Sequence, residues 1–176
     1  MAASERNIHV RRLLAFGVDW LVIVVWAGVL FGVVMTVFSG HPPRPSGPWQ
    51  SQAIGFAAMT LPVLLYFSLS ESSLWQATLG KRALSLRVVY DGVAQAPFSN
   101  SLLRNIIKFT PWEMGHIVAN QAVFSTSSGV PGWVYVPMLL AFACPVWWVV
   151  SIFTRGHAPY DVIASTRVVD GRSVPA

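Results

Sequence analysis

The sequence predicts an all-α membrane protein, a bundle of four transmembrane helices with a small cytoplasmic β-hairpin between the second and third helices. Hydrophobic residues make up 54% of the 176 residues and charged residues only 11%, which is too apolar for a soluble domain of this length. The net charge of +5 comes from lysines and arginines beside the apolar runs, where cytoplasmic anchoring charges belong. We therefore expect a single domain over residues 1–176, embedded in the lipid bilayer.

Three helices follow directly from apolar runs that are long enough to cross a bilayer, and they are expected over about 12–38, 51–70 and 133–153. The first run contains a carboxylate, Asp19. Pro62 lies inside the second run, so we expect a kink there and a substitute partner for the carbonyl that loses its hydrogen bond. Prolines between Gly40 and Trp49 predict an external turn.

The segment 100–123 leaves two alternatives, a kinked span or a helix on the membrane surface, because charged residues and Pro111 interrupt its apolar pattern. Basic residues concentrate before the first helix, between the second and third, and after the fourth, while the external loops hold only Arg44. The positive-inside rule therefore places both termini in the cytoplasm, with the protein in the cell (cytoplasmic) membrane. An even number of crossings is then required, so we expect 100–123 to cross.

A hairpin is expected over about 83–97, where apolar residues alternate on either side of Asp91-Gly92. The β-branched segment Ser165 to Val169 is able to add a third strand and to tie the tail to the middle of the chain.

Charged residues from three segments converge at the cytoplasmic end of this bundle. An aspartate inside a span costs roughly 2.5–3.5 kcal/mol, so Asp19 needs a partner. The expected cluster sets basic groups against two carboxylates: Arg11, Arg12, Arg104 and Lys108 against Asp19 and Asp161. Two interpretations stay open, a buried ion network that fixes helix register and a proton or cation site in which Asp19 changes protonation state.

Two further patterns are candidates for function. Glu113 and His116 are three residues apart, so they can meet on one helix face and form a proton relay if that helix crosses. Gly28 and Gly32 form a small-residue step that lets another helix approach closely. Packing within the chain is the default for this step, and a homo-oligomer contact is the alternative.

Other classes of function are not expected. The histidines have no metal-ligand spacing, and the sequence has no phosphate-binding loop, nucleophile elbow or paired catalytic carboxylates. We therefore expect no enzyme activity, no metal and no cofactor, and the distribution of the basic residues argues against nucleic acid.

Four motifs in order resemble the RDD family of membrane proteins, which is named for an arginine and two aspartates. The first, Arg-Arg-Leu-Leu-Ala-Phe-Gly-Val-Asp, holds Arg12 and Asp19, and the last, Tyr-Asp-Val-Ile-Ala-Ser-Thr-Arg-Val-Val, holds Asp161. Between them, the segments 77–89 and 103–105 resemble the family's central cytoplasmic motif and the helix start that follows it.

The chain departs from the family at two positions, with Tyr160 in place of the usual histidine and Ser165 in place of the usual glycine. The resemblance implies transport, with cation/proton exchange for some members. Our leading hypothesis is a transporter of a small ion, such as a small cation or a proton, or of a small solute. The alternative is a non-transporting membrane scaffold or accessory subunit in which the same charged residues stabilise the fold.

Overall fold

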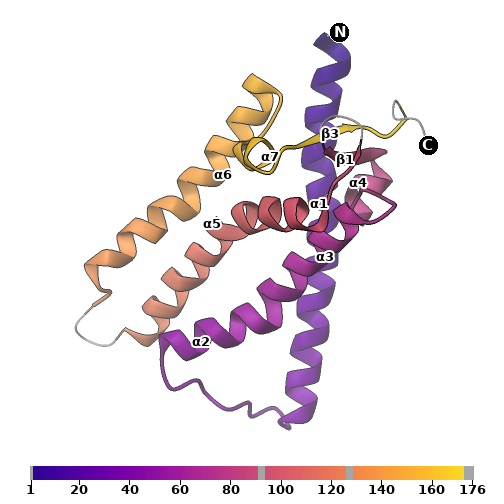
Figure 1. Cartoon of the computed structure of the whole chain (residues 1–176). Helices are drawn as coiled ribbons and strands as arrows, with labels where there is room; N and C mark the ends of the chain where they lie inside the picture. Colours follow the sequence, from indigo (N-terminus) through magenta and orange to yellow (C-terminus); the bar gives the residue numbers. More distant parts are fainter. Residues whose placement is uncertain (1, 91–93, 126–128, 173–176) are drawn as a thin grey trace.

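The computed structural model describes residues 2–90, 94–125 and 129–172, and it is mainly helical, as expected (Figure 1). The long helix α1 (Ala2–Val37) forms one side of the molecule. Helices α2 (Pro48–Gly55) and α3 (Leu61–Ser72) follow it, joined by a π-helical turn, Phe56–Thr60. Helix α5 (Phe98–Phe124) and helix α6 (Tyr135–Arg155), which follows a short 3-10 turn at Gly132–Val134, lie next to each other and lean away from α1 (Figure 1).

Helix α1 begins earlier than the sequence suggested. It starts at Ala2 rather than near Arg12, so the polar N-terminal residues extend the helix rather than forming a separate lead-in. Two short helices were not predicted, α4 (Leu79–Ala83) and α7 (Pro159–Ile163). Both lie at the same end of the molecule as the sheet (Figure 1), and both contribute to the site described below.

Three helical segments of the described chain are long and apolar enough to cross a membrane: Asn7–Val37, Pro48–Ser72 and Gly132–Arg155. Helix α5 is not among them, so three of the four expected spans meet this criterion of length and composition. Helix α5 is long enough but more polar, and several of its polar side chains are buried in the protein: Ser101, Arg104, Asn105 and Gln121.

Helix α5 nevertheless follows α2 and α3 from one end to the other. Near its start, Arg104 contacts Glu71 at the end of α3, with Nη1 2.6 Å from Oε2. Near its end, Asn120 Oδ1 accepts a hydrogen bond from Ser51 Oγ at 2.8 Å, at the start of α2. The helix bends along this path, and Pro111 lies inside it (Figure 1). Helix α5 thus covers the same length as an apolar span and runs antiparallel to it.

The expected kink at Pro62 is accompanied by the π-helical turn immediately before it. Proline has no N–H to donate to the carbonyl of Ala58, four residues earlier. Trp26 of α1 supplies the substitute, because its Nε1 donates to Ala58 O at 3.0 Å. The neighbouring helix therefore satisfies the carbonyl that the proline leaves free, as a nonaqueous environment requires.

The hairpin and the additional third strand are both confirmed. Strand β1 (Leu86–Tyr90) lies between β2 (Ala94–Gln95) and β3 (Thr166–Asp170), and both pairings are antiparallel. The predicted turn residues Asp91 and Gly92 lie outside the described residues. The sheet packs on α1 through a small core of Ala15, Leu86, Val88 and Val168, so the C-terminal strand is held against the first helix.

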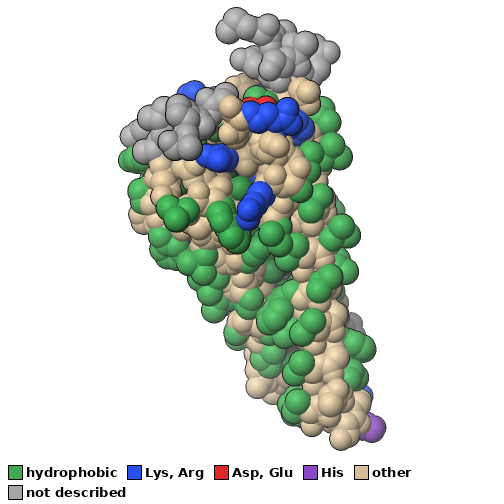
Figure 2. Space-filling view, turned by 90° about the vertical axis from the view of Figure 1, so that its right-hand side faces the viewer, with side chains coloured by type: hydrophobic (Ala, Val, Ile, Leu, Met, Phe, Trp, Pro, Cys, Tyr) green, Lys and Arg blue, Asp and Glu red, His purple; other side chains and the backbone are tan. Residues whose placement is uncertain are grey.

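Charged side chains gather at the end of the molecule that holds the sheet, whereas hydrophobic side chains cover the length of the face shown in Figure 2. Most of the lysines and arginines visible on this face lie at that one end. This distribution is the one that the positive-inside rule associates with a cytoplasmic end.

Candidate functional site: a buried ion network beside a cavity

Asp161 lies between two arginines, as the sequence predicted. Its Oδ2 is 2.5 Å from Nη2 of Arg12, and its Oδ1 is 2.8 Å from Nε of Arg104. Asp161 belongs to α7, Arg12 to α1 and Arg104 to α5, so one carboxylate joins three segments that are far apart in sequence. The backbone N–H of Ala158 also donates to Oδ2 at 3.2 Å, which orients the carboxylate at the start of α7.

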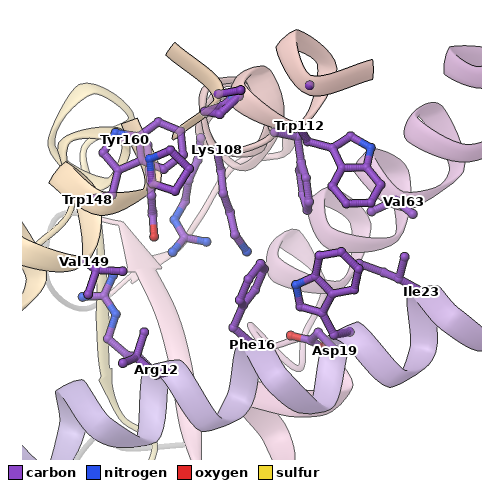
Figure 3. Close-up of a pocket in the computed structure, with 18 of the residues that line it drawn as sticks. Arg12, Phe16, Asp19, Ile23, Val63, Lys108, Trp112, Trp148, Val149 and Tyr160 are labelled. Carbon is purple, nitrogen blue, oxygen red and sulfur yellow. The ribbon is translucent and has the colours of Figure 1, made fainter. Parts of the chain in front are cut away.

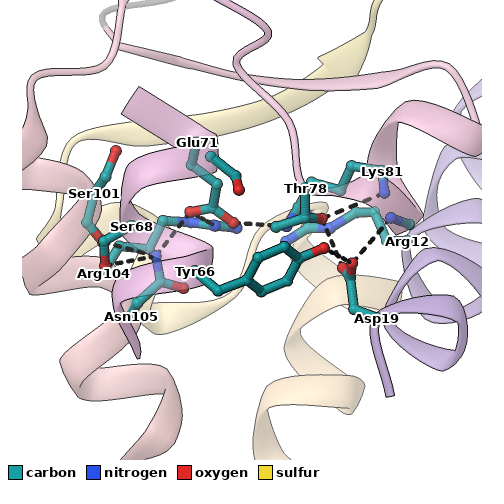
Figure 4. Close-up of polar contacts among 12 residues, drawn as sticks. Arg12, Asp19, Tyr66, Ser68, Glu71, Thr78, Lys81, Ser101, Arg104 and Asn105 are labelled. Carbon is teal, nitrogen blue, oxygen red and sulfur yellow. Dashed lines mark hydrogen bonds and ion pairs between the residues drawn. The ribbon is translucent and has the colours of Figure 1, made fainter. Parts of the chain in front are cut away.

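The network continues to three residues that the predicted charge cluster did not include, Glu71, Lys81 and Asn105 (Figure 4). Glu71, at the end of α3, accepts from Arg104 Nη1 through Oε2 and from Lys81 Nζ through Oε1, each at 2.6 Å. Asn105 Nδ2 donates to Glu71 Oε2 at 2.9 Å. Each carboxylate of the network therefore contacts two cations, and Arg104 bridges the two carboxylates.

These charged groups are buried almost completely. Arg104 is 2% exposed, Asp161 1% and Glu71 0%. Burial alone would raise the pKa of the Asp161 carboxyl, but Arg104 and Arg12 outweigh this and hold its pKa below the ordinary value. A charge that loses water costs several kcal/mol unless its partners replace the solvent, and here every member of the network has such a partner. Every charged side chain of the network therefore has an oppositely charged partner within the network.

Asp19 does not join this network, which corrects the single cluster expected from the sequence. Among the described residues no basic side chain lies within ion-pair distance of its carboxylate. Three uncharged donors surround it instead: Thr78 Oγ1 at 2.6 Å, the Gly80 N–H at 2.9 Å and Tyr66 OH at 3.0 Å (Figure 4). The expected partner Arg11 binds Asp170 of β3, with Nη1 2.7 Å from Oδ2.

The contacts of Asp19 depend on the close approach of α4 to α1. A Cβ on Gly80 would lie 2.0 Å from the carbonyl oxygen of Ala15 and 2.9 Å from Cγ of Asp19, so only glycine fits there. Thr78 precedes α4 as its N-cap, and Tyr66 OH also accepts from the Leu79 N–H at 3.0 Å. Asp19 therefore holds α4 against α1 through its hydrogen bonds to Thr78 and Gly80.

Lys108 also differs from the prediction, because among the described residues no carboxylate lies within 4.0 Å of its Nζ. Three aromatic rings surround the ammonium, with the centroids of Phe67, Phe16 and Phe109 at 4.0, 4.8 and 5.2 Å. Such contacts are worth about 0.5–2 kcal/mol each, whereas removing an ammonium from water costs several kcal/mol. The three rings therefore position the amine and contribute to its stabilisation, in place of a carboxylate.

Lys108 is half-buried, because it lines a cavity of about 530 Å³ between α1, α5 and α6 (Figure 3). Apolar and aromatic side chains form most of the walls, among them Trp20, Trp112 and Trp148. Arg12, Lys81 and Arg104 border the cavity from the ion network, and Asp19 borders it from α1. The cavity therefore has apolar walls and one basic end.

Glu113 and His116 meet as the spacing predicted, with His116 Nδ1 3.3 Å from Glu113 Oε1. Glu113 also accepts hydrogen bonds from Thr60 Oγ1 and, at 2.7 Å, from Gln52 Nε2. His116 lines the cavity, and Glu113 lies behind it toward α2. The pair joins α5 to the second apolar span, and its role as a relay stays a prediction.

The glycine step on α1 has no partner within the described chain. A Cβ at Gly28 or Gly32 would meet nothing within 4 Å, so the default expectation of packing within the chain is wrong. A homo-oligomer contact through this step stays a prediction. No group of three or more His, Cys, Asp or Glu side chains among the described residues is arranged to hold a metal ion.

Tyr160, where the resembled family usually has a histidine, packs beside the network. Its ring contacts Trp148 edge-on at 5.3 Å between centroids, and the Arg104 guanidinium lies 5.4 Å from its centroid. The tyrosine thus closes the basic end of the cavity against α6.

Comparison with known proteins gives one match, to a family model. The family model for the RDD family matches residues 9–165, which include Arg12, Asp19, Arg104 and Asp161. No curated protein and no solved structure matches the chain. The family model covers most of the sequence, and the chain therefore belongs to the RDD family of membrane proteins.

Proposed function

We propose that this protein transports a small solute across the cell membrane, with the cavity between α1, α5 and α6 as the solute site and the ion network as its rigid frame. The observation that carries the proposal is the contrast between the two features. Every charge of the network has a partner, whereas the adjoining cavity holds the unpaired ammonium of Lys108. Its volume of about 530 Å³ falls in the usual range for ligand pockets.

The proposal includes four membrane spans, with both termini in the cytoplasm. The length of α5 and its antiparallel course along α2 and α3 support a fourth crossing. Its polar side chains are compatible with a membrane because they face other helices rather than lipid.

Labelling of single cysteines tests the fourth crossing. In a Cys144→Ala background, Val130→Cys should react with a membrane-impermeant maleimide added outside intact cells, because Val130 follows α5 and is 40% exposed. Leu74→Cys, which lies at the opposite end and is 88% exposed, should react only after permeabilisation. If Val130→Cys also requires permeabilisation, α5 does not cross.

A small cation or proton is the second candidate for the solute, and Glu113 with His116 is the feature that favours it. Both are titratable, they touch each other, and His116 reaches the cavity. Asp19 is less suited to a metal cation, because three donors already occupy its two oxygens and a cation would face basic groups across the cavity.

Filling the cavity tests transport against the scaffold alternative. Gly115 lines the cavity, and an added Cβ there meets nothing within 4 Å, so Gly115→Leu should occupy the space without disturbing the backbone. Ala119→Leu is the matched control, since Ala119 is exposed on the same helix and outside the cavity lining.

The measurement is the current on solid-supported membranes for sodium, potassium, phosphate and short-chain carboxylates. We expect a current for at least one solute, a loss of at least tenfold in Gly115→Leu, and little change in Ala119→Leu. A protein that passes none of these solutes, or a Gly115→Leu variant as active as the wild type, would favour the scaffold.

A further inference from the structure

Lys108, which has no carboxylate partner among the described residues, indicates the charge of a ligand that would suit the cavity. Four basic side chains surround this end of the cavity, from Arg12, Lys81, Arg104 and Lys108, whereas in the part of the chain that the structure describes three carboxylates lie near them, from Asp19, Glu71 and Asp161. Both carboxylates of the network are already shared between two cations each, and Asp19 accepts three hydrogen bonds. Lys108 is therefore the basic side chain that these carboxylates leave over, and its amine points into the cavity (Figure 3).

The walls of the cavity indicate the rest of the ligand. Three of the apolar residues that line it have large exposed fractions, namely Leu13 of α1 and Phe142 and Val149 of α6. Helices α1 and α6 both contain apolar segments that are long enough to cross the membrane. The cavity is thus bordered on the sides of α1 and α6 by apolar side chains from helices long enough to cross the membrane, and such walls are suited to an acyl chain.

We infer that the cavity binds one anionic lipid from the cytoplasmic leaflet, with its acidic headgroup on Nζ of Lys108 and its upper acyl chain against the aromatic walls between α1 and α6. Basic pockets between transmembrane helices on the cytoplasmic side are suited to acidic lipid headgroups. Lys108 follows Arg104 by about one helical turn, so it lies near the charged end of the bundle rather than at its centre. This inference rests on one part of the proposed function, the cavity as a ligand site near the cytoplasmic side, and it names the class of ligand without requiring transport.

Native mass spectrometry of the full chain in a nonionic detergent tests the inference. The probes are phosphatidylglycerol and phosphatidylcholine with identical acyl chains, so they differ in the headgroup, which is anionic in the first and zwitterionic in the second. We expect the wild type to retain one phosphatidylglycerol in preference to phosphatidylcholine. Lys108→Gln should weaken the binding of phosphatidylglycerol about ten- to a hundredfold, the effect of losing one hydrogen bond to a charged group, and leave phosphatidylcholine unchanged.

Three controls make the result specific. Lys108→Arg keeps the charge and should keep the preference, and Arg155→Gln removes an exposed cation outside the cavity and should have no effect. Gly115→Leu leaves Lys108 in place and should displace the lipid by volume. Inorganic phosphate at millimolar concentration should not compete, because it has no acyl chain.

Several outcomes would overturn the inference: equal retention of the two lipids by the wild type, an unchanged preference in Lys108→Gln, or full competition by inorganic phosphate. The test does not depend on transport. Loss of the preference in Lys108→Gln together with absent currents would leave a lipid site on a non-transporting protein. Intact currents with no charge preference would reject the lipid and leave the transporter.

Discussion

Replacing Arg104 with glutamine should remove most of the folded protein. Arg104 bridges Glu71 and Asp161, both of which are fully buried, and the variant would leave each carboxylate with one cation instead of two. Breaking a buried ion pair by removal of one partner costs about 3–5 kcal/mol, which is a large share of the stability of a typical domain. The measurement is the monodisperse yield by size-exclusion chromatography after extraction, together with the thermal midpoint of any protein recovered.

Two variants make this result interpretable. Arg155→Gln removes an exposed arginine and should change the yield little, since surface charges contribute about 0–1 kcal/mol. Arg104→Lys should fall between the two, because a single ammonium does not reproduce the two directions in which Nε and Nη1 donate. A wild-type yield for Arg104→Gln would mean that the network does not hold the helices together.

Gly80→Ala should have the second-largest effect. Its Cβ would lie 2.0 Å from the Ala15 carbonyl oxygen, a backbone atom that has no rotamer with which to move away. Helix α4 would have to move away from α1, which also breaks the hydrogen bond from the Gly80 N–H to Asp19. Overpacking of this kind costs about 1–3 kcal/mol or more, and the loss of a hydrogen bond to the buried carboxylate of Asp19 adds to it.

Gly55→Ala, at a second helical glycine, should raise the stability that Gly80→Ala lowers. An added Cβ at Gly55 meets nothing within 4 Å, so alanine should stabilise the helix by up to about 1 kcal/mol through its higher helix propensity. Thermal midpoints of the two variants should therefore move in opposite directions. Equal shifts would show that α4 does not pack on α1 as closely as described.

The sequence allowed those parts of the site to be predicted that depend on long helices and regular spacing. Asp161 meets Arg12 and Arg104 because the orientation of the spans brings the start of α1, the start of α5 and the end of the chain to one level. Glu113 meets His116 because residues three apart share a helix face. The third strand followed from its β-branched residues.

The remaining parts depend on short segments that have no periodicity. The partners of Asp19 come from Thr78 and Gly80, in and just before a helix of five residues, and hydroxyl and backbone donors leave no charge pattern in a sequence. Glu71 and Lys81 lie on either side of the loop between α3 and α4, so their pairing required the position of α4. Glu71 pairs with Lys81 and Arg104, so Lys108 has no carboxylate partner among the described residues.

The most direct test of the central claim, that the charges form the frame and the cavity holds the solute, is the transport rate per folded molecule of Asp19→Asn beside Gly115→Leu. Asparagine keeps one acceptor oxygen for three donors, so Asp19→Asn should lower the folded yield while its folded molecules still transport. Gly115→Leu should fold normally and lose transport. The account is contradicted if Asp19→Asn folds at the wild-type level with no transport while Gly115→Leu transports at the wild-type rate.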